Sequence, residues 1–214
     1  MTINKFAYDP ISAWTYILGE AGQPCLVFDL GSNPKHALER YVESHHGGKV
    51  LGLFLTHGHF DHFAGLNDLD PAFECPLYVP ALDEVCLFDS HRNGSFELGL
   101  GSIELEEKRP YELLSGGEHL KLGPYEIEVI HTPFHTQGSL CYYLKNEKIL
   151  ISGDTLFHLS VGRGDLRHSV PSKMNGSLKK LLDLPDETKV YPGHGPSSTL
   201  GQEKLYNPFL RISH

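Results

Sequence analysis

Four side chains that can bind a metal ion lie within six positions of the sequence, where an apolar segment ends. They are His57, His59, Asp61 and His62 in the stretch LTHGHFDHFAG, and the preceding KVLGLFL is typical of a buried strand. Residues two apart in an extended segment point the same way, so His57 and His59 can hold one ion. Asp61 and His62 follow a turn of the chain and can hold a second ion.

Three further segments repeat this arrangement of a β-type run followed by a histidine or an aspartate. HTPFHTQGS carries His131 and His135 after YEIEVI, ISGDTLF carries Asp154 after KILIS, and YPGHGP carries His194 after KVYP. Gly and Pro surround each candidate, as tight loops around a small site require. Imidazole and carboxylate ligands without thiolate favour zinc, iron or manganese in a catalytic role.

Leaving His131 aside, these segments offer five histidines and two aspartates as ligands. Seven ligands are too many for one tetrahedral ion, but they suffice for two ions if one aspartate bridges them. Two ions ~3.5 to 4 Å apart can hold a hydroxide between them and polarise a carbonyl or phosphoryl oxygen. The first motif, HxHxDH after a strand, favours a metal by itself, the other three are weak alone, and the four together indicate a metal site.

The elements that must position these residues alternate between strands and helices. NPKHALERYVESHHGG predicts a helix with Asn33 as N-cap, Pro34 at the first helical position and Gly47 after the end. Residues 95–152, including SIELEE, have mainly β-type patterns, and residues 171–184 predict a second long helix. Both halves end strands in polar clusters, which is where ligand sites form in layered α/β folds.

Composition excludes several classes of protein. The 214 residues can bury a full core, and we expect one domain over residues 1–214 with two halves meeting near residue 100. The net charge of -9 argues against a nucleic-acid partner, which would need a basic face. No window approaches the ~18 apolar residues of a membrane span. The stretch MTINKFAYDPISAW shows no secretory signal, so the expected compartment is the cytoplasm. The composition predicts no particular oligomeric state.

The four cysteines show no CxxC pair and no regular spacing. Three of them, Cys25, Cys86 and Cys141, lie in apolar contexts, where a cysteine is usually a small core side chain. We therefore expect free thiols rather than a framework of disulfide bonds.

The motifs THGHFDH, TPFHTQGS, GDTLF and YPGHGP, in this order and spacing, resemble the metallo-β-lactamase superfamily. More narrowly, they resemble a short single-domain branch of its glyoxalase II-like enzymes, the hydroxyacylglutathione hydrolases. The resemblance covers almost the whole chain and implies an α+β fold, a four-layer αββα sandwich with the metals between two central sheets. It also implies two divalent metal ions as cofactors, with zinc as the expected metal and iron or manganese as alternatives.

The resemblance assigns the seven ligands individually. The first metal takes His57, His59 and His135, the second takes Asp61, His62 and His194, and Asp154 is the bridging carboxylate.

Two other polar residues lie close to these ligands in the sequence or after a similar strand. His131 matches no ligand of the family and is a supporting or core residue. Asp29, after the early strand PCLVFDLG, is either a carboxylate that orients a ligand or an ordinary turn former.

The sequence departs from the family in three places. Phe134 replaces a glycine beside a ligand, which changes the wall of the site or the loop conformation. The C-terminal helical domain that helps two-domain relatives hold glutathione has no counterpart after His194. The family's cationic substrate contact falls on Arg163, but Asp165 stands where the family has a tyrosine, so Arg163 either contacts substrate or pairs with Asp165.

The function that the resemblance implies is hydrolysis of acyl-thioesters, S-lactoylglutathione or a related hydroxyacyl-thiol, by a hydroxide that bridges two metal ions. Asp61 is the catalytic candidate because it can accept a proton as the hydroxide attacks. One alternative is a mononuclear iron persulfide dioxygenase of the same fold. Another is a metal-free, non-catalytic binding module. The acidic charge disfavours a ribonuclease, and the missing secretion signal disfavours a β-lactamase.

Overall fold

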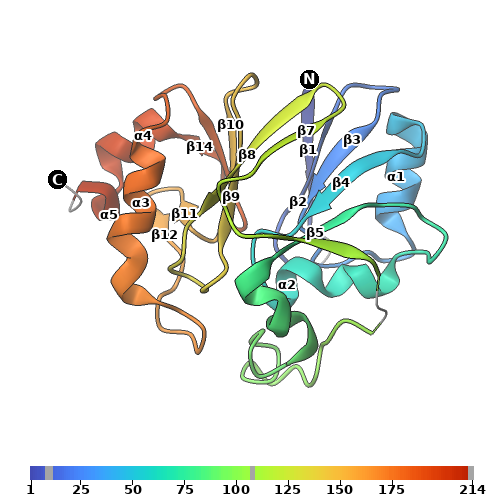
Figure 1. The fold of residues 1–214 in the computed structure, drawn as a ribbon, viewed down its shortest axis with the longest axis horizontal. Coiled ribbons are helices and arrows are strands. Elements are labelled where there is room, and N and C mark those ends of the chain that lie inside the picture. Colours follow the sequence, from blue (N-terminus) through green and yellow to red (C-terminus); the bar gives the residue numbers. More distant parts are fainter. Residues whose placement is uncertain (8–11, 107–108, 212–214) are drawn as a thin grey trace. The chain divides into compact units, whose positions relative to one another are not determined.

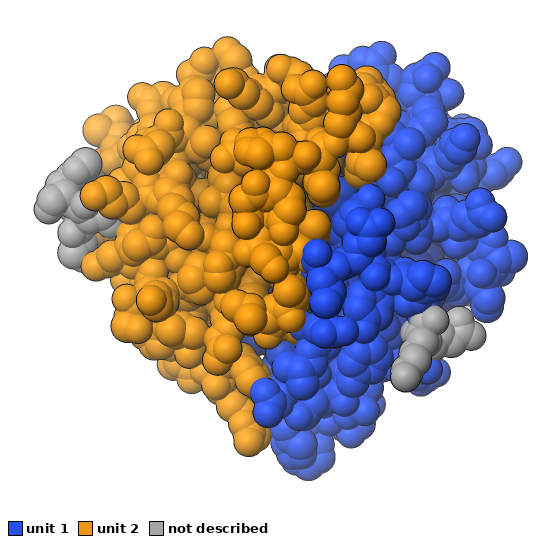
Figure 2. Space-filling view, in the orientation of Figure 1, with its two compact units in different colours: residues 1–79, 84–113 blue, residues 80–83, 114–214 orange. Residues whose placement is uncertain are grey.

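The computed structural model describes residues 1–7, 12–106 and 109–211. These residues form two compact units, which Figure 2 colours separately. Unit 1 comprises residues 1–79 and 84–113, and unit 2 comprises residues 80–83 and 114–214. The division falls later than the expected boundary near residue 100, and a single domain over residues 1–214 stays a prediction.

Unit 1 is built on a six-stranded sheet in which the strands follow chain order. The strands are β1 (Thr2–Phe6), β2 (Thr15–Gly19), β3 (Cys25–Phe28), β4 (Val50–Phe54), β5 (Leu77–Pro80) and β6 (Tyr111–Leu114). Strands β3, β4 and β5 are parallel neighbours. Their carboxyl ends therefore lie at one edge of the sheet, and the polar residues that follow β3 and β4 come together there.

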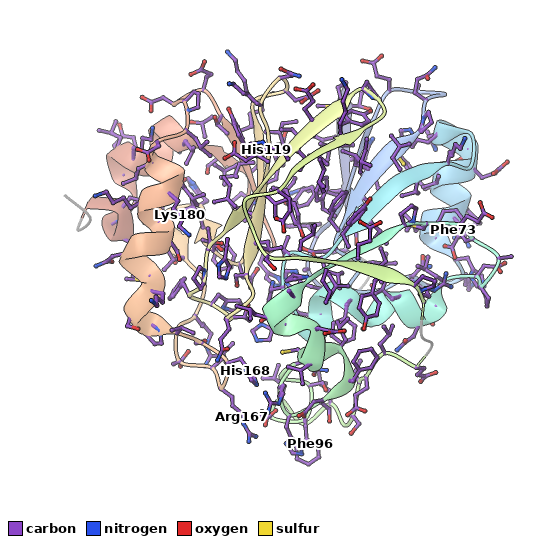
Figure 3. The ribbon with its side chains drawn as sticks, viewed as in Figure 1. Phe73, Phe96, His119, Arg167, His168 and Lys180 are labelled. Carbon is purple, nitrogen blue, oxygen red and sulfur yellow. The ribbon has the colours of Figure 1, made fainter. Side chains whose placement is uncertain are left out.

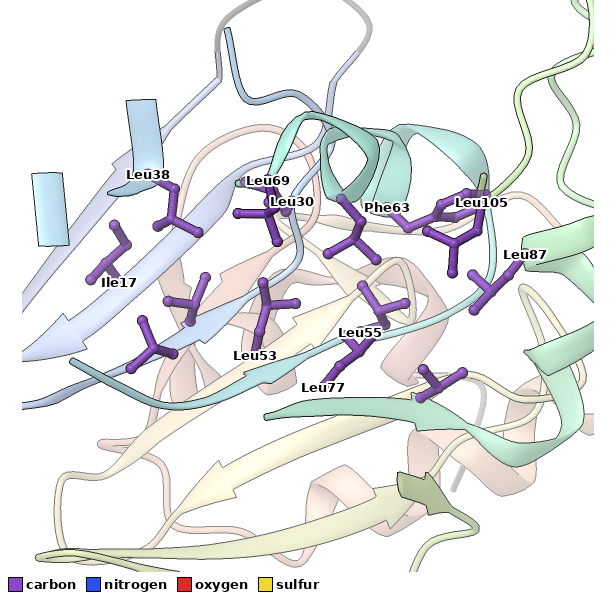
Figure 4. Packing of buried hydrophobic residues seen from close by; sticks show 14 of the residues in the cluster. Ile17, Leu30, Leu38, Leu53, Leu55, Phe63, Leu69, Leu77, Leu87 and Leu105 are labelled. Atoms are coloured by element: carbon purple, nitrogen blue, oxygen red, sulfur yellow. The ribbon is translucent and has the colours of Figure 1, made fainter. Parts of the chain in front are cut away.

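One face of this sheet is covered by helix α1 (Ala37–His46) and by the short helix α2 (Phe60–Phe63). Leu38 of α1 and Phe63 of α2 share a buried cluster with Ile17, Leu53 and Leu55 from the strands and the segment after β4, as Figure 4 shows. Burying a side chain of this size contributes about 1.5 to 3 kcal/mol. The cluster therefore holds α2, which carries two ligand candidates, against the sheet.

Unit 2 is built on a second six-stranded sheet, in the order β14-β13-β10-β9-β8-β7. The strands are β7 (His119–Leu122), β8 (Tyr125–His131), β9 (Leu140–Leu144), β10 (Ile149–Gly153), β13 (Lys189–Pro192) and β14 (Ser198–Thr199), with a separate hairpin of β11 (Leu156–Phe157) and β12 (Ser160–Val161). Strands β10 and β13 are parallel, so the ends that precede Asp154 and His194 lie at the same edge.

Three helices at the C-terminal end of the chain pack on the unit 2 sheet (Figure 1). They are α3 (Met174–Leu182), α4 (Leu200–Tyr206) and α5 (Pro208–Arg211). Leu178 of α3 and Leu200 of α4 join Leu150 and Val190 of the strands in a buried cluster. Three 3₁₀ helices complete the fold, η1 (Ala64–Asp68), η2 (Ala81–Phe88) and η3 (Pro171–Lys173).

The predicted start of the first helix is wrong. Helix α1 begins at Ala37, because Lys35 and His36 both adopt left-handed backbone angles, with φ of 53° and 55°. Asn33 still binds this end of the helix, since its side-chain oxygen accepts a hydrogen bond from the Leu38 amide at 2.8 Å. The predicted end is correct, with Gly47 left-handed at φ 60°.

The predicted strand in SIELEE is also wrong for its described part, residues 102–106, which forms no strand. Side chains take the place of a neighbouring strand there. Asn67 hydrogen-bonds the Glu104 carbonyl and the Glu106 amide, and Ser95 accepts from the Ile103 amide.

Among the described residues, no helix combines the length and apolar character needed to cross a membrane.

The four thiols are free, as expected. Burial raises the pKa of Cys25 to about 12 and is the largest cause of the same rise at Cys75, and it raises the pKa of Cys141 to about 11. Cys86 is buried as well. Because the thiolate is the reactive form, native thiols should be nearly inert at pH 8.

We therefore expect iodoacetamide at pH 8 to label the folded chain at a small fraction of the rate seen with the chain unfolded in guanidinium. Mass spectrometry of timed samples would measure this rate, and unfolding should expose all four thiols. Rapid labelling of Cys141 in the native protein would contradict the burial described here.

Candidate metal centre

In unit 1, two histidine rings meet directly after strand β4. His57 Nε2 lies 3.0 Å from His59 Nδ1, and both rings are buried. The Thr56 hydroxyl donates its proton to Asp29. Its oxygen can therefore only accept a hydrogen bond from His57 Nδ1, which lies 3.1 Å away. His57 therefore carries its proton on Nδ1 and turns the lone pair of Nε2 toward His59. Two facing ring nitrogens of this kind can hold a cation.

The neighbouring His62 is oriented by the buried carboxylate of Asp29. His62 Nδ1 donates to Asp29 Oδ2 at 2.8 Å, which leaves His62 Nε2 as the ligand atom. That atom lies 3.8 Å from Asp61 Oδ2, and the His62 and His57 rings are 4.0 Å apart. The sequence left open whether Asp29 orients a ligand or only forms a turn. In the structure its carboxylate holds His62, a predicted ligand.

The turn that carries Asp29 is packed tightly against the loop of ligands. Asp29 is left-handed at φ 56°, an uncommon conformation that Asp tolerates better than most residues. Its Oδ1 accepts from the Thr56 amide at 2.7 Å. Two residues on, a Cβ at Gly31 would overlap the carbonyl oxygen of Asp61, so only glycine fits there. The backbone thus fixes the distance between Asp29 and the ligands.

In unit 2, two predicted histidine ligands lie near one carboxylate oxygen of the third predicted ligand, Asp154. Asp154 Oδ2 lies 3.4 Å from His135 Nε2 and 3.8 Å from His194 Nε2. His135 Nδ1 donates to the backbone carbonyl of Arg163 at 2.9 Å, so its Nε2 is again the ligand atom. The arrangement suits a carboxylate that is shared between metals, which stays a prediction.

The loop that carries His135 is held from both ends by groups that the sequence did not single out. On one side, Lys180 of α3, labelled in Figure 3, donates to the His131 carbonyl at 2.6 Å. On the other, the buried Asp83 accepts from the Thr136 hydroxyl at 2.6 Å and from the Gly138 amide at 2.7 Å. His131 itself donates to Gln137 within the loop, so its role there is structural.

Phe134, which stands in place of a family glycine, is buried and packs against Gly164 of the following loop. Its φ angle is not left-handed, so the position does not require glycine. The substitution therefore changes the side chain that packs inside this loop, and the backbone at residue 134 keeps a negative φ angle.

Arg163 forms a bidentate pair with Asp165. Nε and one terminal nitrogen of the guanidinium donate to the two carboxylate oxygens at 2.9 and 3.0 Å. Hydrogen bonding between the two side chains raises the pKa of Arg163 and lowers that of Asp165. Both side chains are exposed. The pairing that the sequence left open therefore exists, and contact of Arg163 with substrate stays a prediction.

The donor set of the two units fits divalent metal ions. Each unit supplies imidazole nitrogens and a carboxylate oxygen, and in each unit at least one imidazole has its second nitrogen held by an acceptor. Metal-binding histidines in proteins are held in this way. The residues in unit 1 are His57, His59, Asp61 and His62, and those in unit 2 are His135, Asp154 and His194.

Comparison with known proteins agrees with this chemistry. Residues 8–194 match the model of the metallo-β-lactamase superfamily, and the chain belongs to that family. The probable metallo-hydrolase YqgX of Bacillus subtilis is 37% identical over 211 residues, which is 98% of each chain. The hydroxyacylglutathione hydrolase GloC of Haemophilus influenzae is 32% identical over 185 residues, which is 86% of each chain.

Two solved structures share the fold over nearly the whole chain. BLEG-1, described as a B3 metallo-β-lactamase, has a TM-score of 0.89 at 34% identity and covers 98% of this chain and 99% of its own. TTHA1623, solved in a di-iron-bound form, has a TM-score of 0.81 at 34% identity. The match covers 97% of this chain and 100% of the TTHA1623 chain. The predicted α+β fold of the metallo-β-lactamase type is thereby confirmed.

Replacement of Asp29 by asparagine tests the orientation of His62. Asparagine tolerates the left-handed backbone, but its amide would donate to His62 Nδ1 and move the histidine proton to Nε2. We expect metal affinity to fall ~10 to 100-fold, the usual effect of losing such a partner. A competition titration with a zinc chelator would measure it.

The matched control is Asp68→Asn, which makes the same change at an exposed aspartate of unit 1. It should bind metal as the wild type does. Equal affinities in all three proteins would mean that Asp29 does not orient His62 as a ligand.

Proposed function

We propose that this chain is a metal-dependent hydrolase of acyl-thioesters, of the glyoxalase II type. The seven ligands of the two units together hold two divalent ions, with zinc as the expected metal. The first ion takes His57, His59 and His135, the second takes Asp61, His62 and His194, and Asp154 bridges them.

The observation that carries this proposal is the orientation of the imidazoles. In unit 1 the Asp29 carboxylate, and in unit 2 the Arg163 carbonyl, each accept the Nδ1 proton of a histidine and leave Nε2 for a metal. A folded chain has little reason to bury several imidazoles beside carboxylates unless a cation joins them. The substrate class is supported by the similarity to GloC, a hydroxyacylglutathione hydrolase.

Bound divalent ions would supply a hydroxide nucleophile near neutral pH and polarise the thioester carbonyl. The protein's own groups must then orient the ligands and manage the proton of the nucleophile. Asp61 suits the second task, because its side chain keeps 16% of its surface exposed while Oδ2 stays 3.8 Å from His62. The thiolate that leaves needs little help from an acid, so no further proton donor is required.

The number of metal ions and the substrate separate this proposal from its competitors. We expect two ions per chain by elemental analysis and hydrolysis of S-lactoylglutathione, with activity lost on chelation and restored by zinc. A single iron with oxygen-dependent turnover of glutathione persulfide would identify a dioxygenase instead. Because BLEG-1 is described as a metallo-β-lactamase, a chromogenic cephalosporin belongs in the same screen.

Asp154→Asn tests the shared carboxylate. Because Asp154 would contact both ions, its loss should weaken both and reduce kcat by more than the ~10 to 100-fold expected for a supporting residue. Asp183→Asn makes the same change at an exposed position of unit 2 and should leave both ions in place. Retention of two ions and near-full kcat in Asp154→Asn would refute the bridging role.

Arg163→Ala tests recognition of the thiol. Because the guanidinium is exposed and already paired with Asp165, we expect KM for S-lactoylglutathione to rise only a few-fold while kcat stays unchanged, the pattern of lost uniform binding. Lactoyl esters of shorter thiols should be hydrolysed at comparable kcat. A large rise in KM, or no turnover of the short esters, would instead indicate a specific glutathione pocket.

A further inference from the structure

The hairpin that follows Asp154 contacts all three ligands of unit 2. It comprises β11, β12 and the next two residues, and we call it the 156–163 hairpin. Its last carbonyl, that of Arg163, accepts the Nδ1 proton of His135 at 2.9 Å. A Cβ at Gly162 would overlap the carbonyl oxygen of Asp154, so the two backbones touch. The Phe157 ring lies edge-on to His194, with 6.3 Å between the ring centroids.

The tip of this hairpin has a conformation that needs support. Leu159 is left-handed at φ 55° although it is neither Gly nor Asn, and its side chain is exposed. An exposed leucine gains nothing from packing that would offset this strain. Hydrogen bonds from elsewhere must therefore hold the turn.

Those hydrogen bonds come from the C-terminal helices through two fully buried polar residues, Glu203 and Asn207. Glu203 Oε2 accepts from the Leu159 amide at 2.8 Å, and Oε1 lies 3.1 Å from His158 Nδ1. Asn207 Nδ2 donates to Ser160 O at 3.0 Å and to Glu203 Oε2 at 2.9 Å. Asn207 Nδ2 also donates to Phe157 O at 3.4 Å, so the pair binds the backbone of the hairpin on both sides of its turn.

We propose that Glu203 and Asn207 are positioning residues for the metal centre, which set the orientation of His135, Asp154 and His194 through the 156–163 hairpin. In the described part of the chain, the side chains of both residues form hydrogen bonds with the hairpin and with each other rather than with a predicted ligand. The three donors around the buried Glu203 carboxylate replace its lost hydration and thereby fix its position against the hairpin. The inference rests on the proposed metal centre and adds to it two residues of the C-terminal segment that support the ligands through the hairpin.

Two measurements on the full chain test this proposal. The first is the zinc affinity, measured by competition with a chelator, and the second is the visible absorption spectrum of the cobalt-substituted protein. Glu203→Ala removes all the acceptor contacts and should weaken zinc binding about 10 to 100-fold and alter the cobalt spectrum. Glu203→Gln keeps an oxygen for the Leu159 and Asn207 donors, while its amide can donate to His158. It should bind zinc within a few-fold of the wild type.

Two comparisons separate positioning from general loss of stability. Glu187→Ala removes an exposed glutamate of unit 2 that pairs only with Lys148 among the interactions described, and it should change neither measurement. Circular dichroism and thermal melting of the metal-free proteins show which variants fold. If Glu203→Ala does not fold, Asn207→Ala decides by the same two measurements.

Folded alanine variants with wild-type zinc affinity and an unchanged cobalt spectrum would overturn the proposal, as would a glutamine variant as weak as the alanine variant. A wild-type chain that binds no metal would overturn the proposed function, and this inference with it. Wild-type metal binding without thioester hydrolysis would refute only the substrate class and would leave the positioning role standing on the zinc titration.

Discussion

An imidazole presents one nitrogen to a metal in a fixed direction only if its other nitrogen is held, and the arrangement of both units follows from this constraint. In unit 1 the holder is the Asp29 carboxylate, which binds His62 Nδ1 and both donors of Thr56. In unit 2 the holder is the Arg163 carbonyl, which binds His135 Nδ1. The two units therefore hold their imidazoles with different acceptors, a carboxylate in unit 1 and a neutral carbonyl in unit 2.

The scaffold satisfies this constraint by bringing backbones into direct contact beside the ligands. At Gly31 the turn after β3 lies against the Asp61 carbonyl, and at Gly162 the hairpin lies against the Asp154 carbonyl. A side chain at either position would separate the two segments that must hold each other. The distance between the ligands and the groups that hold them is therefore set by backbone packing rather than by long flexible side chains. Such packing suits a site whose ligands must be placed within about half an ångström.

The predicted substrate contact has much less structure around it than the predicted ligands have. Arg163 is the cationic position expected to meet the thiol. Its side chain is exposed and paired with Asp165, while its backbone carbonyl accepts the Nδ1 proton of His135. The main chain of the same residue therefore orients His135, a predicted ligand, whatever its side chain contacts. Membership of the metallo-β-lactamase superfamily favours a hydrolase, and the substrate stays a prediction.

The sequence alone determined the family and the strands that precede each predicted ligand, because hydrophobic runs and short motifs are local features, while the ligand roles themselves stay predictions. It could not predict the late start of α1, the absence of a strand in residues 102–106, or the roles of Thr56, Asp83 and Glu203. The roles of these side chains depend on partners distant in the chain: Thr56 lies 27 residues from Asp29, and Glu203 lies 44 residues from Leu159. Only the tertiary structure decides such pairs, because a buried polar group takes whichever partner the packed backbones bring within hydrogen-bonding distance.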